Sequence, residues 1–284
     1  MNEVAGAQDI RRRIRSVRNM QQITKAMKMV SAAKLRKAQL KLNAARPYAL
    51  QMQGVLERLA QAPVDEIHPL LIKRPVHKVV YVLITSDRGL CGGYNANLIR
   101  KVSGMIKEAQ QEVKLVTVGR KGRDFFRRGK TEFLAEYTGF GDEPSYNQAK
   151  EVAQEVIRLY EEGEADEVYL LYTEFVTAMT QRPTQIKLLP MEQPVAKEGK
   201  EYIFEPSAEE ILNSLLPKYI ETQIYRTILE GKASEQGARM TAMSSATDNA
   251  KDMIDRLSLA MNRARQAAIT TEISEIVSGA AALE

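Results

Sequence analysis

The sequence predicts an α/β protein in which long N- and C-terminal helices form an antiparallel coiled coil, with a central, open α/β domain between them in the chain. Two observations predict this fold. Both ends of the chain are rich in helix-forming residues and carry apolar or small residues at alternating steps of three and four. Between them, short apolar runs rich in β-branched residues alternate with helical patterns. We therefore expect an N-terminal helix over 1–60, a globular domain over 75–205 and a C-terminal helix over 207–284.

The N-terminal segment predicts a long helix because residues 7–46 contain neither glycine nor proline. Roughly 40 residues at ~1.5 Å each would give a rod of about 60 Å. Its later part carries the spacing of a coiled-coil seam. The predicted seam positions are Ala38, Leu42, Ala45, Ala49, Met52, Leu56 and Leu59.

The C-terminal segment predicts a second long helix that begins after Ser207, since Ser207 and Glu210 have the spacing of a capping box. Pro217 allows a kink near its start, and no proline follows. The simplest arrangement pairs the two end segments within one chain, although the same spacing also fits a homodimeric coiled coil. The predicted seam positions are Met240, Met243, Thr247, Ala250, Ile254, Leu257, Met261, Ala264 and Ala268.

The central segment predicts an open, Rossmann-like sheet, because apolar strand patterns alternate with helical ones. Residues 79–84 form a near-continuous apolar run, as expected of a strand buried on both faces. Further strands are expected at 113–118, 133–137 and 168–172, with helices at 96–111, 121–128 and 145–162. Residues 185–189 and 202–204 are expected to add an edge strand or hairpin.

No enzyme chemistry can be assigned from the motifs. Residues 122–131 end in Gly-Lys-Thr like a phosphate-binding loop, but the first glycine is misplaced and a strand pattern follows instead of a helix. Residues 86–95 (SDRGLCGGYN) form a glycine-rich turn after the first strand, where a ligand is the alternative to a plain strand-to-helix turn. Cys91 is the only cysteine, and the two histidines do not form a ligand pattern. We expect no catalytic residue, cofactor or metal.

The charge distribution makes the N-terminal rod basic. Residues 7–46 contain twelve Lys or Arg and one acidic residue, Asp9, whereas the whole chain has a net charge of +5. Such a stripe suits a solvated face, an acidic protein partner or a nucleic acid. The rod has no aromatic residue before Tyr48 for base stacking. No run reaches the ~18 apolar residues of a membrane span, so we expect membrane association only through partners.

Several motifs closely resemble those of the gamma subunits of F-type ATP synthases. The C-terminal residues 269–282 (ITTEISEIVSGAAA) carry the strongest likeness. Residues 233–243 and 246–249 on the same helix, 22–27 on the N-terminal rod, and 86–95 after the first strand are also similar to that family. The resemblance covers nearly the whole chain.

The resemblance implies a non-catalytic central stalk that couples proton-driven rotation to ATP synthesis or hydrolysis at beta-subunit sites. Its partners would be the ring of alpha and beta subunits, the epsilon subunit and the membrane ring of c subunits. It would lie peripherally on the cytoplasmic side of a bacterial membrane. A bacterial origin is expected because photosynthetic relatives carry an extra cysteine pair that Cys91 alone cannot supply. The alternative is a basic coiled-coil protein that binds nucleic acid or forms a homodimeric scaffold.

The resemblance also implies particular contacts of the shaft with beta subunits. The positions that match are Met27, Arg239, Gln266, Thr270 and Glu275. The end of the C-terminal helix is expected to outreach its mate and to need a hydrophobic bearing. The bearing residues are Ile273, Ile276, Val277 and Leu283.

Overall fold

The computed structural model describes residues 2–59, 68–129, 131–192, 205 and 207–281. The chain divides into two compact units, one of Met1–Val30 with Met240–Glu284 and one of Ser31–Arg239. Two long helices, α1 (Asn2–Leu59, 58 residues) and α5 (Ala208–Ala281, 74 residues), contribute to both units. Long N- and C-terminal helices in contact with each other, together with a central α/β sheet, confirm the predicted fold class.

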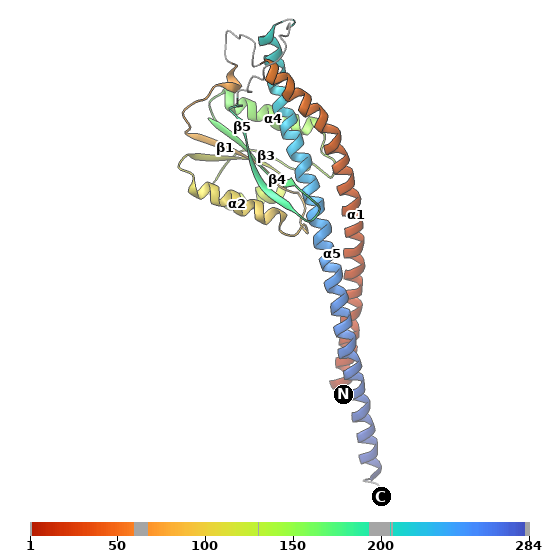
Figure 1. The fold of residues 1–284 in the computed structure, drawn as a ribbon. Helices are drawn as coiled ribbons and strands as arrows, with labels where there is room; N and C mark the ends of the chain where they lie inside the picture. Colours follow the sequence, from red (N-terminus) through yellow and green to blue (C-terminus); the bar gives the residue numbers. More distant parts are fainter. Residues whose placement is uncertain (1, 60–67, 130, 193–204, 206, 282–284) are drawn as a thin grey trace. The chain divides into compact units, whose positions relative to one another are not determined.

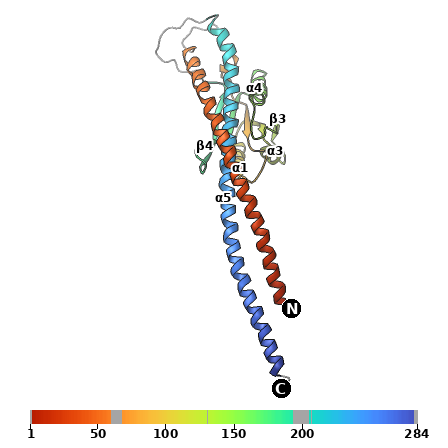
Figure 2. The same ribbon diagram turned by 90° about the vertical axis from the view of Figure 1, so that its right-hand side faces the viewer.

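The first unit is an antiparallel helix pair (Figure 2). Lys28 Nζ donates to Ser244 Oγ at 2.9 Å, and Thr247 Oγ1 donates to Thr24 Oγ1 at 2.9 Å. The two contacts set the direction, because residue numbers fall along α1 as they rise along α5. Every predicted C-terminal seam position is buried or half-buried, whereas residues 269–278 are all exposed.

In the second unit, α1 uses the seam predicted for its later part. Ala38, Ala49, Met52, Leu56 and Leu59 are buried, and the remaining two predicted positions are half-buried. The helix continues through the exposed Pro47, which removes one main-chain donor but leaves the apolar spacing intact. Packing of the seam therefore outweighs the helix-breaking effect of that proline.

The second unit is built on a five-stranded sheet of order β3-β2-β1-β4-β5 (Figure 1). The strands are β1 (Lys78–Ile84), β2 (Glu112–Val118), β3 (Glu132–Tyr137), β4 (Glu167–Phe175) and β5 (Gln181–Leu189). The first four are parallel, and β5 pairs antiparallel with β4 at the edge. Pro183 is compatible with β5 because an edge strand has one side without ladder hydrogen bonds.

Helices cover both faces of the sheet (Figure 1). One face packs against α2 (Tyr94–Glu108) and α3 (Arg120–Phe126), around Leu83, Leu98 and Leu115. The other face carries the larger core, to which α4 (Tyr146–Glu161), α5, the end of α1 and the short 3-10 helix η1 (Pro69–Leu71) contribute. The fully or almost fully buried α5 side chains of that core include Leu216, Ile220 and Ile224.

The observed elements lie close to the predicted ones. The α5 helix begins directly after Ser207, whose Oγ accepts from the Glu210 main-chain N–H at 3.2 Å, as a cap requires. The α2 helix begins two residues before the predicted start and ends at Glu108, because Ala109 adopts an extended conformation. The expected strand at 202–204 lies outside the described residues.

Candidate functional site

The edge of the sheet where an open α/β fold binds its ligand is covered in this chain by α5. The strand order reverses between β1 and β4, and ligands of such folds bind beyond the carboxyl ends of the strands at that point. Here Ser234 Oγ of α5 donates to the main-chain oxygen of Thr173 in β4 at 2.9 Å. Tyr94 Oη donates to the main-chain oxygen of Gly231 at 3.0 Å. The helix therefore occupies the usual ligand position.

The space left between α5 and these strand ends is about 10 Å³. It is bordered by Thr85, Asp87 and Gly119 on the sheet side and by Gly231 and Glu235 on the α5 side. Such a volume suits at most a single water molecule. A nucleotide has no room there.

The α5 helix carries a buried ion-pair network next to this edge. Glu235 accepts from Arg239 at 2.7 Å and from Lys232 at 3.2 Å, and Arg239 also donates to the Gly89 main-chain oxygen at 3.2 Å. The Glu235 and Arg239 side chains are only 5% and 9% exposed. Removing one member of a buried pair leaves an uncompensated charge, so each of these groups depends on the others.

The glycine-rich turn over 86–95 is a structured connection between β1 and α2. Asn95 Nδ2 donates to Ser86 Oγ at 2.8 Å, and Leu90 has a left-handed backbone with φ 62°. Asp87 accepts from the main-chain N–H groups of Arg120 and Gly139 at 3.0 and 3.2 Å. The turn thus ties together the loops that follow three parallel strands.

Cys91 lies inside this turn as a packed thiol. It is 2% exposed and forms one buried cluster with Tyr94 and Ala238. Burial raises the pKa of the Cys91 thiol, more than the nearby Arg239 charge lowers it. Because the thiolate is the reactive form, this cysteine lacks the activation that a nucleophile needs.

Lysines of α1 bind the acidic loop that follows β3. Lys34 Nζ donates to Asp142 at 2.7 Å, Lys41 Nζ donates to Glu143 at 2.9 Å, and Lys37 also pairs with Glu143. Hydrogen bonds from Lys37 and Lys41 lower the pKa of Glu143 to about 2. Burial opposes ionisation of Asp142, yet the Lys34 hydrogen bond and nearby positive charges hold its pKa below the ordinary value. Part of the basic stripe is therefore paired within the chain.

The residues that resembled a phosphate-binding loop do not form one. Gly122 lies within α3, where a Cβ would come within 3.0 Å of Leu83 and Thr85 side-chain atoms. Its glycine therefore permits close packing of the helix on β1. The run then leads into β3 at Glu132, so no helix N-terminus follows to bind phosphate.

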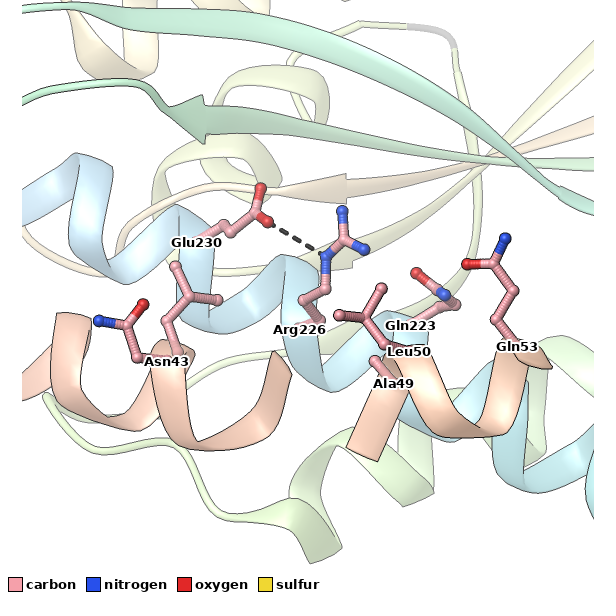
Figure 3. A pocket seen from close by; sticks show the side chains of 8 residues that line it. Asn43, Ala49, Leu50, Gln53, Gln223, Arg226 and Glu230 are labelled. Carbon is pink, nitrogen blue, oxygen red and sulfur yellow. Dashed lines mark hydrogen bonds and ion pairs between the residues drawn. The ribbon is translucent and has the colours of Figure 1, made fainter. Parts of the chain in front are cut away.

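A groove between α1 and α5 in the second unit has a volume of about 320 Å³ (Figure 3). Arg226 Nε donates to Glu230 at 3.1 Å, so its charge is already balanced. The lining combines amide, aliphatic and ion-paired side chains, without a nucleophile next to a base. The lining residues are Leu42, Asn43, Ala49, Leu50, Gln53, Gln223, Arg226 and Glu230.

The residues assigned to beta-subunit contacts fall into both units. Arg239 is the buried member of the ion-pair network, and Met27 is half-buried on α1. Gln266, Thr270 and Glu275 are exposed on α5; Thr270 Oγ1 donates to the Gln266 main-chain oxygen at 2.9 Å, so these two adjoin along one helix.

The apolar end of α5 is exposed. Ile269, Ile273, Ile276 and Val277 are between 48% and 66% exposed. Leu283 lies outside the described residues.

The sequence patterns did not reveal the network around Glu235 or the lysine contacts of the acidic loop. A signal for the former exists, since Gly231 and Gly237 lie in a helix interior, where glycine costs about 1 kcal/mol relative to alanine. Glycine there indicates a close approach of another segment. The lysine contacts carried no comparable signal, because the paired residues are about a hundred positions apart.

The described residues define an α/β protein with long terminal helices, in which α5 covers the usual ligand edge of the sheet and ends in an exposed apolar stretch. Among the described residues, no cluster of three or more potential metal ligands occurs. In the same residues, no helix has the length and apolar character to cross a bilayer.

Comparison with known proteins identifies the family. A family model described as ATP synthase matches residues 6–283. The chain is 71% identical to the ATP synthase gamma chain of Desulfitobacterium hafniense over 99% of this chain and 100% of that one. It is 60% identical to the gamma chain of Heliobacterium modesticaldum, over 98% and 99%.

Solved structures agree with these sequence matches. The central stalk and c-ring structure of the Tetrahymena thermophila mitochondrial ATP synthase contains a similar chain, with a TM-score of 0.63 and 26% identity over 79% of this chain and 99% of that one. A Euglena gracilis mitochondrial ATP synthase chain shares the fold, with a TM-score of 0.73 and 18% identity over 98% of this chain and 95% of that one. The chain belongs to the ATP synthase gamma-chain family. It is a gamma subunit of F-type ATP synthase, the central rotor stalk and a non-catalytic part of that complex. This assignment replaces the alternative of a nucleic-acid-binding or homodimeric scaffold protein.

Proposed function

We propose that the paired helices of this stalk turn inside a ring of alpha and beta subunits, and that the sheet-containing part contacts the epsilon subunit and the membrane ring of c subunits. Proton flow would turn the rotor, and the asymmetric shaft would drive each beta subunit through its conformations. Two findings support these partners. The closely similar gamma chains are bacterial, and a similar chain occurs in a structure of a central stalk with a c-ring. The corresponding location is peripheral, on the cytoplasmic side of a bacterial membrane.

The observation that carries the proposal is the bare apolar end of α5. Ile269, Ile273 and Ile276 recur at helical spacing, so they lie on one side of the helix. Each is about half exposed or more, and burying such a side chain fully is worth about 1.5–3 kcal/mol. An apolar stripe of this kind is typical of a surface that binds another protein. We propose that the subunit ring forms a hydrophobic bearing around it, to which Val277 and Leu283 also contribute.

Polar contacts with beta subunits are proposed at other heights of the shaft. Gln266, Thr270 and Glu275 are exposed, so they are free to meet a surrounding subunit. Met27 lies between the exposed Lys25 and Lys28, which would favour an acidic partner surface.

Arg239 is proposed as a contact of a different kind. Its guanidinium already pairs with Glu235, so a beta subunit would have to approach a group that is 9% exposed. We expect contact there to require a close fit.

The bearing can be tested in the assembled ATP synthase by placing Asp at both Ile273 and Val277. We expect weaker binding of the stalk to the alpha and beta ring and a lower ratio of proton pumping to ATP hydrolysis, because two carboxylates would be buried in an apolar bearing. Co-purification of the subunits and vesicle pumping assays measure these effects.

The matched control places Asp at Ser274 and Ser278, which have the same spacing on another face of the helix and are also exposed. This control leaves the apolar stripe intact, so it should bind the ring more tightly and pump better than the Ile273→Asp, Val277→Asp complex. Normal assembly and pumping of the Ile273→Asp, Val277→Asp complex would contradict the bearing.

A further inference from the structure

Nine consecutive residues of α5, 231–239, are buried on every side of the helix. Their sequence, GKASEQGAR, contains three charged residues and no large apolar one. A surface helix normally leaves its polar face in water. This stretch instead has neighbours all around it within the second unit, and we call it the enclosed stretch.

The turn over 86–95 contacts the enclosed stretch at three heights. Tyr94 Oη donates to the Gly231 main-chain oxygen at 3.0 Å, and Arg239 donates to the Gly89 main-chain oxygen at 3.2 Å. Between them, Ala238 forms one buried cluster with Cys91 and Tyr94 of the turn. These contacts span more than two helical turns of α5.

Strand β4 and the hairpin that follows it contact the enclosed stretch elsewhere. Ser234 Oγ donates to the Thr173 main-chain oxygen at 2.9 Å. A Cβ on Gly237 would lie 3.3 Å from the Ala178 main-chain oxygen, and one on Gly231 would lie 3.3 Å from Ile84 Cγ2 and Tyr94 Oη. A methyl group at either glycine would therefore require its neighbours to move by a few tenths of an ångström.

We propose that the neighbours of the enclosed stretch form a rigid socket that fixes α5 against the sheet. This socket transmits torque between the sheet-containing body and the shaft. Contacts to main-chain atoms on separate elements oppose both rotation and sliding of the helix, which a purely apolar surface would oppose less specifically. Arg239 is the last residue of this compact unit, and the shaft portion of α5 begins at Met240. The inference rests on the rotor-stalk function; it assigns the turn over 86–95 a positioning role.

A reversible cross-link tests the socket in the assembled ATP synthase. Cys91 is the only native cysteine of the chain and shares a buried cluster with Ala238, so Ala238→Cys places a second thiol in that cluster. Diamide, which accepts the two electrons and two protons, should convert the pair to a disulfide. ATP hydrolysis and ATP-driven proton pumping should stay within two-fold of the reduced complex, because the joined segments do not move relative to each other. The control carries Ala238→Cys with Cys91→Ser and cannot form the bond.

Two outcomes would overturn the socket. One is failure of the disulfide to form. The other is a loss of pumping on oxidation that dithiothreitol reverses and that the control does not show. Such a loss would mean that the enclosed stretch moves relative to the turn over 86–95 during rotation.

A second variant tests whether a tight socket is required for coupling. Gly231→Ala, added to the Ala238→Cys variant, places a methyl group 3.3 Å from its neighbours. Alanine also has the higher helix propensity, so the substitution does not weaken the helix itself. We expect the pumping-to-hydrolysis ratio to fall at least two-fold in the reduced state and to recover when the Cys91 disulfide with position 238 forms. An unchanged ratio, or a lowered ratio that oxidation does not restore, would contradict the inference.

Subunit co-purification separates the two proposals. If the stalk without any bearing substitution fails to bind the ring, the proposed bearing is contradicted. If the complex assembles but the cross-link or the Gly231→Ala variant gives its opposing result, only the socket is contradicted.

Discussion

Two stretches of α5 reverse the usual relation between polarity and burial. Residues 231–239 are mostly small or charged and are buried, whereas residues 269–278 include three isoleucines and a valine and are exposed. The first stretch has partners within the chain for its charges, notably Arg239 and Lys232 on Glu235. The apolar side chains of the second are exposed in this chain, which supports the proposed bearing on another subunit. Tertiary contacts, rather than amino-acid composition, therefore determine which stretch of α5 is buried in the free chain.

The largest expected effect is in main-chain hydrogen exchange of the free chain. An isolated helix end is marginally stable in water, so amides of 269–281 should exchange at close to the unprotected rate. Amides of 231–239 should exchange at least about 10⁴-fold more slowly than those of 269–281, because opening them requires disruption of the second unit. Hydrogen-exchange mass spectrometry measures both. Equal protection of the two stretches would remove the contrast.

A second test compares the same substitution at two leucines of α5. Leu216→Ala should lower the free energy of unfolding by about 2–5 kcal/mol, because Leu216 is 1% exposed in the larger core. Leu259→Ala should change it by about 0.5 kcal/mol or less, since Leu259 is 62% exposed. Urea unfolding of the purified chain gives both values, and similar losses would contradict the difference in burial between Leu216 and Leu259.

The smallest effect concerns the lysine contacts of the acidic loop. The folded-state pKa of Glu143 is about 2, below its ordinary value of 4.5. Its contribution to stability is therefore full above pH 4.5 and is lost as the pH falls toward about 2. Glu143→Gln should lower the urea midpoint slightly at pH 7, and the difference from the unmodified chain should shrink across that window.

Glu151→Gln, at an exposed position of α4, is the control and should follow the unmodified chain. A difference between Glu143→Gln and the unmodified chain that grows toward pH 2 would show that the ion pairs do not stabilise the fold.

Most of the fold follows from local sequence patterns. The predicted seams, the strand at 79–84 and the start of α5 after Ser207 each depend on spacing within a few residues, and the structure has them. The bare end of α5 also follows, because the C-terminal segment is longer than its mate.

The socket could not be predicted in the same way. Tyr94 and Gly231 are 137 positions apart, and the hydrogen bond between them depends on how α5 crosses the sheet. Burial of Glu235 likewise depends on neighbours that no local pattern identifies. The contact residues of the other subunits stay predictions, because they depend on surfaces outside this chain.

The placement of α5 in the larger core has a consequence for how the chain is made. Strand β5 ends at Leu189, but the core on that face of the sheet includes side chains up to Ile228. At about 5–20 residues per second, the ribosome adds these roughly forty residues in about two to eight seconds. During that time the strands exist without the helix that covers them. Biosynthesis of this subunit thus contains an interval in which a nearly complete sheet exposes an apolar face, and the folding of its body must wait for the C-terminal helix to be synthesised.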